Sequence, residues 1–158
     1  MAIAPAVIPE IDWVARVREG FRPFAAGSFR ITPAWEATPD PDSPAEPTDG
    51  RTERILVVEP GLAFGTGTHE STRLCLSALE DRARAGPLGD VLDVGAGSGI
   101  LSAAAALLGA RRVIAVELDP EALPVAVRHR ELNRVPVRIL RGDGARAVRA
   151  NAFDLVLA

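Results

Sequence analysis

Four short apolar runs in the second half of the chain alternate with longer segments of helix-forming composition. The apolar runs cover residues 91–94, 112–116, 137–140 and 153–158. Runs of this length, rich in β-branched residues, are typical of strands buried on both faces of a parallel sheet. The segments 100–108, which is rich in alanine, and 119–133 are predicted to be helices. This alternation predicts an α/β fold in which a parallel sheet carries flanking helices.

The first half of the chain has a weaker pattern. A short helix is predicted over 11–21, and a longer one from about Thr68 to Ala85, where Gly86 and Pro87 end it. Strands are predicted over 28–32 and 55–58, and these two segments are expected to pair. The aromatic residues before residue 36 are expected to form a small satellite core.

The composition of the chain limits which class of protein it can be. The 158 residues are enough for one domain with a hydrophobic core, and 47% hydrophobic and 25% charged residues are typical of a globular protein. The formal net charge of -3 gives no support for general nucleic-acid binding. A single cysteine favours a reducing compartment. Because the sequence has neither a long apolar run nor a convincing signal peptide, a cytoplasmic location without membrane contact is expected.

The chemistry concentrates between residues 90 and 119. The first apolar run reaches Asp93 and leads into the glycine loop (residues 95–99), and the next run ends at Glu117. Glycine lets a backbone turn sharply and lets a ligand approach closely. Because ligands bind beyond the carboxyl ends of parallel strands, we expect Asp93, Gly95, Gly97 and Glu117 to converge on one ligand site.

Three interpretations fit this pattern. A dinucleotide site has the spacing G-x-G-x-x-G, whereas the glycine loop has G-x-G-x-G. Asp93 would repel a pyrophosphate but suits a cationic sulfonium, and Glu117 suits the ribose hydroxyls of either ligand. S-adenosylmethionine is therefore favoured over a nicotinamide dinucleotide. The third interpretation is an ordinary tight turn without a ligand.

A second unusual stretch, EPGLAFGTGTHEST, covers residues 59–72. Backbone N–H groups at the start of the following helix favour a carboxylate, and S-adenosylmethionine carries one at its methionine end. Thr72, one turn inside this helix, is a candidate to add a hydroxyl. His69 is interpreted as a hydrogen-bonding anchor of the loop, with a role as a base as the alternative.

The segment after Glu117 supplies one more candidate. Asp143 follows the third apolar run and either accepts a hydrogen bond from an adenine amino group or is a turn aspartate. The preceding helix is expected to have Asp119 as its N-cap and to lose one backbone bond at Pro124 in its second turn. By its spacing, His129 is expected to face solvent.

Several motifs together resemble one family. The stretches EPGLAFGTGTHESTRLCL, VLDVGAGSGIL and VIAVELDPEAL resemble the ribosomal protein L11 methyltransferases (PrmA), which are class I S-adenosylmethionine-dependent methyltransferases. The upstream IDWVARVREGFRPFAAGSFRITPAWE is similar to the segment before their catalytic domain, so the resemblance covers about residues 11–158. The resemblance implies a Rossmann-like fold.

The resemblance also implies a function. Members of the family transfer methyl groups from S-adenosylmethionine to amino groups, on a lysine side chain or an N-terminal amine, of a large-subunit ribosomal protein. By motif match, Thr72 would contact the cofactor, Gly95 would lie under its methionine moiety, and Glu117 would hold the ribose. No catalytic residue is identified and no metal is expected. A monomer without direct contacts to nucleic acid is expected.

The resemblance divides the chain into three regions. Residues 1–36 are expected to be a lead-in with a short helix and strand, 37–50 a proline- and aspartate-rich linker or loop, and 51–158 a partial S-adenosylmethionine-binding domain. Because family members have a preceding domain and further strands, the chain is expected to be truncated, with 153–158 as an exposed edge strand. The alternatives are a binding module without catalysis, a methyltransferase with another protein substrate, and a nicotinamide oxidoreductase.

Overall fold

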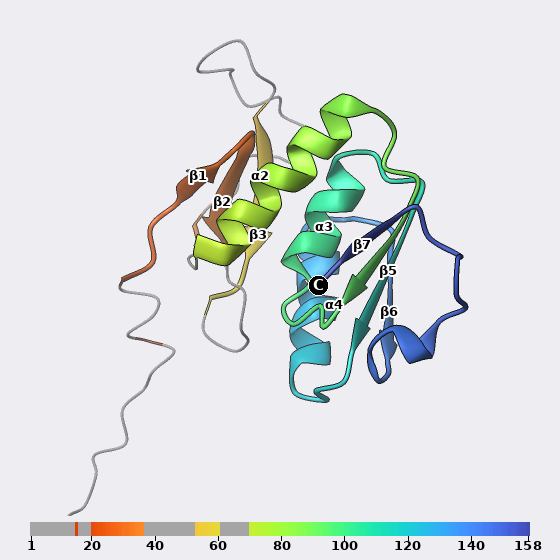
Figure 1. The fold of residues 1–158 in the computed structure, drawn as a ribbon. Coiled ribbons are helices and arrows are strands. Elements are labelled where there is room, and N and C mark those ends of the chain that lie inside the picture. The colour runs from red at the N-terminus through yellow and green to blue at the C-terminus, as the bar shows by residue number, and fades with distance from the viewer. Residues whose placement is uncertain (1–14, 16–19, 37–52, 61–69) are drawn as a thin grey trace, which may run out of the picture.

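The computed structural model describes residues 15, 20–36, 53–60 and 70–158. Within these ranges the chain forms two sheets, three α-helices and one 3-10 turn, η1 (Gly144–Ala147). Figure 1 shows the two sheets on opposite sides of the helices. Most of the predicted helix 11–21, the linker 37–50 and the loop with His69 lie outside the described residues.

The larger sheet has four parallel strands in the order β6-β5-β4-β7. Its strands are β4 (Asp90–Val94), β5 (Arg112–Glu117), β6 (Val137–Arg141) and β7 (Leu155–Leu157). All four predicted strands and their parallel arrangement are confirmed. The register pairs Glu117 with Arg141 and Val94 with Val116, so the carboxyl ends of β4, β5 and β6 lie at one edge (Figure 1).

The smaller sheet has the strand order β1-β2-β3. Its strands are β1 (Phe24–Ala26), β2 (Phe29–Pro33) and β3 (Arg54–Val58). Strands β1 and β2 form an antiparallel hairpin, whereas β2 and β3 are parallel. The predicted pairing of 28–32 with 55–58 is confirmed, and β1 is an element that the sequence pattern did not indicate.

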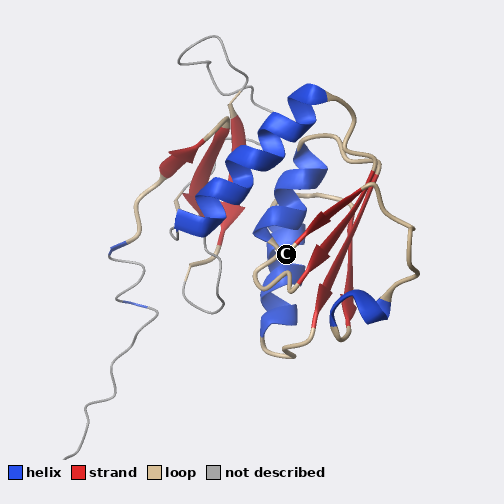
Figure 2. Ribbon diagram, viewed as in Figure 1, coloured by secondary structure: helices blue, strands red, loops and turns tan. Residues whose placement is uncertain are grey.

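Helix α3 (Ile100–Leu107) lies between the two sheets, as Figure 2 shows. It contacts β4, β5 and β6 on one side and β3 on the other. Its central residues Ala103, Ala104 and Ala105 are at most 2% exposed. A helix covered on opposite sides has little room for long side chains, and alanine also has the highest helix propensity. The alanine-rich composition therefore reflects contact with both sheets.

Helix α4 (Ala122–Leu132) packs against α3, β6 and β3. Asp119 does not cap the helix itself, because its Oδ1 accepts the N–H of Glu121 at 2.9 Å in the turn that precedes α4. Pro124 therefore lies in the first helical turn, where N–H groups have no partner within the helix. The predicted loss of a backbone bond at Pro124 is wrong for this reason.

Helix α2 (Glu70–Ala85) contacts both β1 and α3, and so links the β1–β2 hairpin to the rest of the protein. Its residues Leu76 and Leu79 are buried. The Glu80 carboxylate is also buried and accepts the backbone N–H of Ser28, in the hairpin turn, at 2.8 Å. Arg84 pairs with Glu80 one turn along the helix, so this buried carboxylate has a charged partner.

The hydrophobic core is continuous between the two sheets. Phe29 of the smaller sheet and Val91 of the larger sheet belong to one buried cluster. Phe21, Phe24 and Trp35 pack at its edge, where the Phe21 ring centroid lies 5.9 Å from that of Phe24 and 6.2 Å from that of Trp35. The expected separate satellite core is therefore part of the main core.

The face of the larger sheet away from α3 carries a second apolar cluster. Leu92 and Ile114 are buried there against Val148 and Phe153, which belong to the segment between β6 and β7. Val156 of β7 pairs with Leu92 in the register and is 56% exposed. The predicted exposed apolar edge strand is confirmed.

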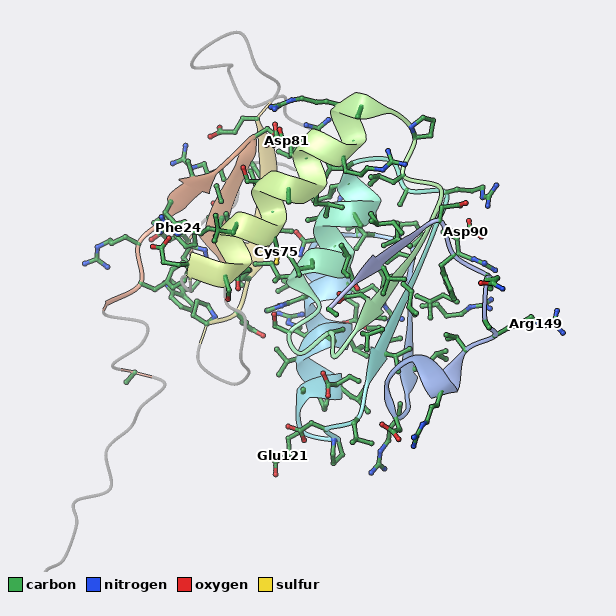
Figure 3. The ribbon with its side chains drawn as sticks, in the orientation of Figure 1. Phe24, Cys75, Asp81, Asp90, Glu121 and Arg149 are labelled. Atoms are coloured by element: carbon green, nitrogen blue, oxygen red, sulfur yellow. The ribbon has the colours of Figure 1, made fainter. Side chains whose placement is uncertain are left out.

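Charged side chains join the amino-terminal ends of the larger sheet's strands. The Asp90 carboxylate accepts a hydrogen bond from Arg111 at 2.6 Å and pairs with Arg112 at 2.6 Å. The hydrogen bond from Arg111 holds the pKa of Asp90 below its usual value. Asp154, just before β7, accepts the backbone N–H of Asp90 at 2.7 Å. Asp90, labelled in Figure 3, thus lies at the sheet edge opposite the predicted ligand site.

Candidate ligand-binding site

The candidate site lies at the carboxyl-terminal edge of the larger sheet. The glycine loop follows β4 there, and its residues Gly95 and Ala96 donate backbone hydrogen bonds to Val116 of β5 at 2.8 and 3.1 Å. Gly142, after β6, donates to the carbonyl of Glu117 at 3.0 Å. The three loops are therefore neighbours, and this edge is where parallel α/β sheets bind ligands.

The glycine loop has a backbone that other residues rarely adopt. Gly95, Gly97 and Gly99 have φ values of 69°, 53° and 73°, in the left-handed region. A Cβ added at Gly95 would meet nothing within 4 Å, whereas one at Gly99 would lie 3.3 Å from the Cβ of Ala126 in α4. Gly99 thus permits helix α4 to approach, and Gly95 faces open space in which a ligand has room.

Glu117 organises the glycine loop from the end of β5. Its Oε2 accepts the backbone N–H of Gly97 at 2.7 Å, and its Oε1 accepts those of Leu118 and Asp119 at 2.7 and 2.9 Å. A carboxylate has about four acceptor positions, so one remains for a ligand hydroxyl. Glu117 is half-buried, which leaves it accessible at the site.

Asp93 lies beneath the site rather than at its surface. The odd-numbered residues of β4 face α3, and the Asp93 Oδ2 accepts a hydrogen bond from the Ser102 hydroxyl of that helix at 2.6 Å. Asp93 is 2% exposed. Burial raises the pKa of Asp93, the hydrogen bonds from Ser102 oppose this, and the nearby charge of Glu117 adds to it. Asp93 therefore lies beneath the glycine loop, bonded to Ser102 and shielded from solvent.

Asp143 has the contacts of a turn residue. Its carbonyl accepts the backbone N–H of Arg146 at 3.2 Å, and its carboxylate pairs with the Arg146 guanidinium at 3.2 Å. The side chain is exposed at the end of β6. The turn and the adenine-binding interpretations are compatible with each other, because an exposed carboxylate retains free acceptor positions.

Thr72 lies in the first turn of α2 and is 7% exposed. The residues that precede α2, including His69, are outside the described part of the chain. The structure therefore places Gly95, Gly97 and Glu117 together and puts Thr72 on a separate element.

His129 is buried, so its predicted solvent-facing position is wrong. It is 1% exposed, whereas a solvent-facing side chain was expected. Its Nδ1 lies 2.8 Å from the carbonyl of Ser98 in the glycine loop, and its Nε2 accepts the backbone N–H of Glu59, after β3, at 2.8 Å. Burial lowers the pKa of His129. The available signal was the helical spacing to Val125 and Ala126, both of which are buried.

The residues that the structure describes contain no group of three or more His, Cys, Asp or Glu side chains that could hold a metal ion. None of their helices has the length and apolar character needed to span a membrane.

The fold and the site together define a Rossmann-like α/β domain, with a glycine loop after one strand and an acid at the end of the next. The family model described as "Ribosomal protein L11 methyltransferase (PrmA)" matches residues 2–158, and the chain belongs to this family.

Individual relatives agree with this assignment. The chain is 44% identical over 158 residues to the ribosomal protein L11 methyltransferase of Geobacter sulfurreducens, covering 98% of this chain and 48% of the relative. It is similar to the crystal structure of the ribosomal protein L11 methylase of Lactobacillus delbrueckii subsp. bulgaricus (TM-score 0.63, 31% identity, 81% of this chain and 59% of that chain). A T. thermophilus 16S rRNA methyltransferase in complex with AdoMet and guanosine is also similar (TM-score 0.52, 31% identity, 60% of this chain and 26% of that chain).

The chain spans about half the length of the curated relatives that it matches. The alignments cover 46%, 47% and 48% of three of them.

Proposed function

We propose that this chain forms the S-adenosylmethionine site of a protein methyltransferase that transfers methyl groups to amino groups of ribosomal protein L11. The observation that carries the proposal is the convergence of the glycine loop and Glu117 at one sheet edge, in a chain of the ribosomal protein L11 methyltransferase family. Two relatives carry the matching names, and a similar rRNA methyltransferase was solved with AdoMet.

The residues present fit this ligand. The open space beside Gly95 leaves room for the methionine moiety, and the remaining acceptor position of Glu117 suits a ribose hydroxyl. An ionised Asp93 carboxylate at this buried position would favour a cationic sulfonium and disfavour a pyrophosphate. Gly97, whose N–H donates to Glu117, is assigned to the same ligand site. Asp143 is assigned to bind the adenine amino group. Thr72 is assigned to the cofactor beside the loop before α2.

When bound, S-adenosylmethionine would supply an electrophilic methyl group: a neutral amine would attack the methyl carbon in line, the carbon–sulfur bond would break, and S-adenosylhomocysteine would leave. The chain's contribution is alignment of the two reactants, which accounts for a large share of the rate enhancement in such reactions. A lysine amine with a pKa of about 10.4 is neutral in only about one molecule in a few thousand at pH 7, whereas an α-amine with a pKa near 8 is about a tenth neutral. Lysine methylation therefore requires desolvation of the amine or a base, and we assign no residue to that role.

The remaining expectations belong to the same proposal. The substrate is a ribosomal protein of the large subunit, the protein acts as a cytoplasmic monomer, and neither nucleic acid nor a membrane is a direct partner. The net charge of -3 is in keeping with a protein substrate rather than a nucleic acid.

A calorimetric titration of the 158-residue chain with S-adenosylhomocysteine tests the binding step, with circular dichroism as the control for folding. Micromolar binding would support the site, and preferential binding of NADH would overturn it. Transfer of labelled methyl groups to purified ribosomal protein L11, compared with bulk lysate proteins, tests the substrate. Binding without any methylated product would identify a binding module, and labelling of other proteins alone would identify a different substrate.

A further inference from the structure

His129 connects two parts of the protein that are far apart in the sequence. It projects from α4, and its ring lies between the carbonyl of Ser98 in the glycine loop and the backbone N–H of Glu59 beyond β3, each at 2.8 Å. Glu59 is 70 residues away in the sequence. With 1% exposure, the imidazole has no access to water as a substitute partner.

These contacts fix the protonation state of the ring. The Glu59 N–H can only donate, so the Nε2 of His129 must be the acceptor. The Ser98 carbonyl can only accept, so Nδ1 must carry the proton. A neutral ring with the Nδ1–H tautomer satisfies both partners, whereas a second proton on Nε2 would break the bond to Glu59.

Asn133, the C-cap residue of α4, makes a parallel set of contacts four residues after His129. Its amide accepts the N–H of Val57 at 2.7 Å and donates to the carbonyl of Val57 at 2.8 Å. Val57 and Glu59 alternate along the outer edge of β3, so both side chains bind the same strand edge. Of the two side chains, His129 has a hydrogen bond to the glycine loop, whereas the Asn133 amide also donates to the backbone carbonyl of His129 at 2.8 Å.

We infer that His129 is a positioning residue, which holds the glycine loop in its ligand-binding conformation by fastening the Ser98 carbonyl to the end of β3. Ser98 lies between Gly97 and Gly99, so movement of its carbonyl changes the backbone that faces the ligand. The inference rests on the proposed S-adenosylmethionine site for its ligand, but its geometry concerns the ligand-free protein as well.

The charges around His129 are few among the described residues. Glu59 contributes a negative charge from the end of β3, and Arg128 contributes a positive charge from α4. These two side chains pair with each other at 3.4 Å, and the glycine loop contributes only the uncharged Ser98 carbonyl at the ring. Burial therefore dominates, and it favours the neutral ring that the hydrogen bonds require.

The test compares His129→Ala with Asn133→Ala, a matched variant that loses hydrogen bonds to β3 but none to the glycine loop. Native-state amide exchange at Gly97 and Gly99 is measured without ligand, and S-adenosylhomocysteine affinity is measured by calorimetry. We expect His129→Ala to speed exchange at these amides by about tenfold and to weaken binding by about tenfold, the usual effect of leaving a buried group unpaired. Asn133→Ala should change both by less than about threefold.

His129→Gln provides the rescue. A glutamine amide can accept from Glu59 and donate to Ser98, and it does not titrate. Its affinity should lie within about threefold of the wild type. The wild type should lose affinity when acid protonates the native His129 ring, whose pKa burial holds below its usual value, and this loss should be absent in His129→Gln. Nitrogen chemical shifts of the ring at neutral pH should identify the Nδ1–H tautomer.

Unchanged glycine-loop exchange in a folded His129→Ala variant would overturn the positioning role, and so would an Nε2–H tautomer. Equal effects of His129→Ala and Asn133→Ala would overturn it too, since a general loss of docking would then explain both. Failure of the wild-type chain to bind S-adenosylhomocysteine would instead reject the proposed function, because the exchange comparison needs no ligand.

Discussion

The Glu117 carboxylate accepts the backbone N–H of Gly97 across 2.7 Å, so the residue that ends β5 holds the loop that follows β4. The same carboxylate accepts the N–H groups of Leu118 and Asp119, which begin the next loop. One side chain thus fixes two of the loops at the site before any ligand binds. Preorganisation of this kind lowers the cost of ordering the site on binding.

Replacing Glu117 with alanine should weaken S-adenosylhomocysteine binding by about 1–3 kcal/mol, because ribose hydroxyls and the Gly97 N–H would both lose an acceptor. Calorimetric titration measures the effect, and circular dichroism confirms that the variant is folded. Unchanged affinity in a folded Glu117→Ala chain would show that this carboxylate does not hold the ribose.

Replacing Asp93 with asparagine removes the ionisable carboxyl group but keeps an oxygen that can accept the hydrogen bond from Ser102. Burial raises the pKa of Asp93 above its value in the unfolded chain, so the ionised carboxylate destabilises the native state as pH rises through that window. Asp93→Asn should therefore unfold at higher urea concentration than the wild type at pH 7.

The same variant should lose part of its preference for S-adenosylmethionine over S-adenosylhomocysteine. Only the former carries a sulfonium charge, and we expect the ratio of the two affinities to fall about fivefold, or roughly 1 kcal/mol. An unaltered ratio would mean that the buried charge does not reach the sulfonium.

Gly95→Ala and Gly109→Ala form a matched pair. Both glycines have positive φ, 69° and 86°, and an added Cβ would meet nothing within 4 Å at either position. Each substitution should therefore destabilise the chain by a similar 1–2 kcal/mol, roughly, through backbone strain alone. Only Gly95→Ala should weaken S-adenosylhomocysteine binding, because its methyl group would occupy ligand space. Equal affinities in the two variants would place the ligand away from Gly95.

Stability should fall on acidification below pH ~6.5, where histidine in the unfolded chain takes up a proton. Burial lowers the pKa of His129 in the native state, so the unfolded state binds more protons in this window. The slope contributed by His129 is at most about 1.4 kcal/mol per pH unit and ends below its native pKa. Urea unfolding between pH 5 and 8 measures it, with His129→Gln as the reference. Parallel curves for the two proteins would argue against a buried neutral ring.

The glycine loop, Glu117 and the four parallel strands were predictable because their signals are local. Glycine spacing identifies the turn, and apolar runs that end in an acid identify the strands. The buried position of Asp93 was harder to predict, although the alternation of side chains in β4 points it toward Ser102 only nine residues away.

His129 and β1 show why other features escaped prediction. A hydrogen-bond partner of the buried His129 is Glu59, which follows a strand of the other sheet, and no pattern around residue 129 encodes that contact. Strand β1 has three residues and exists through its hairpin with β2 and the Glu80 carboxylate in the hairpin turn. Long-range partners of this kind are absent from a local reading of the sequence.

The hydrogen bonds of Asn133 and His129 to the outer edge of β3 have a consequence for self-association. A free strand edge offers unpaired N–H and C=O groups to other chains, and this is a common route to aggregation. Here Val57 and Glu59 present those groups to side chains of α4. The groups at Val57 and Glu59 are therefore not open to strand addition, because two side chains of α4 and its C-cap already bind them.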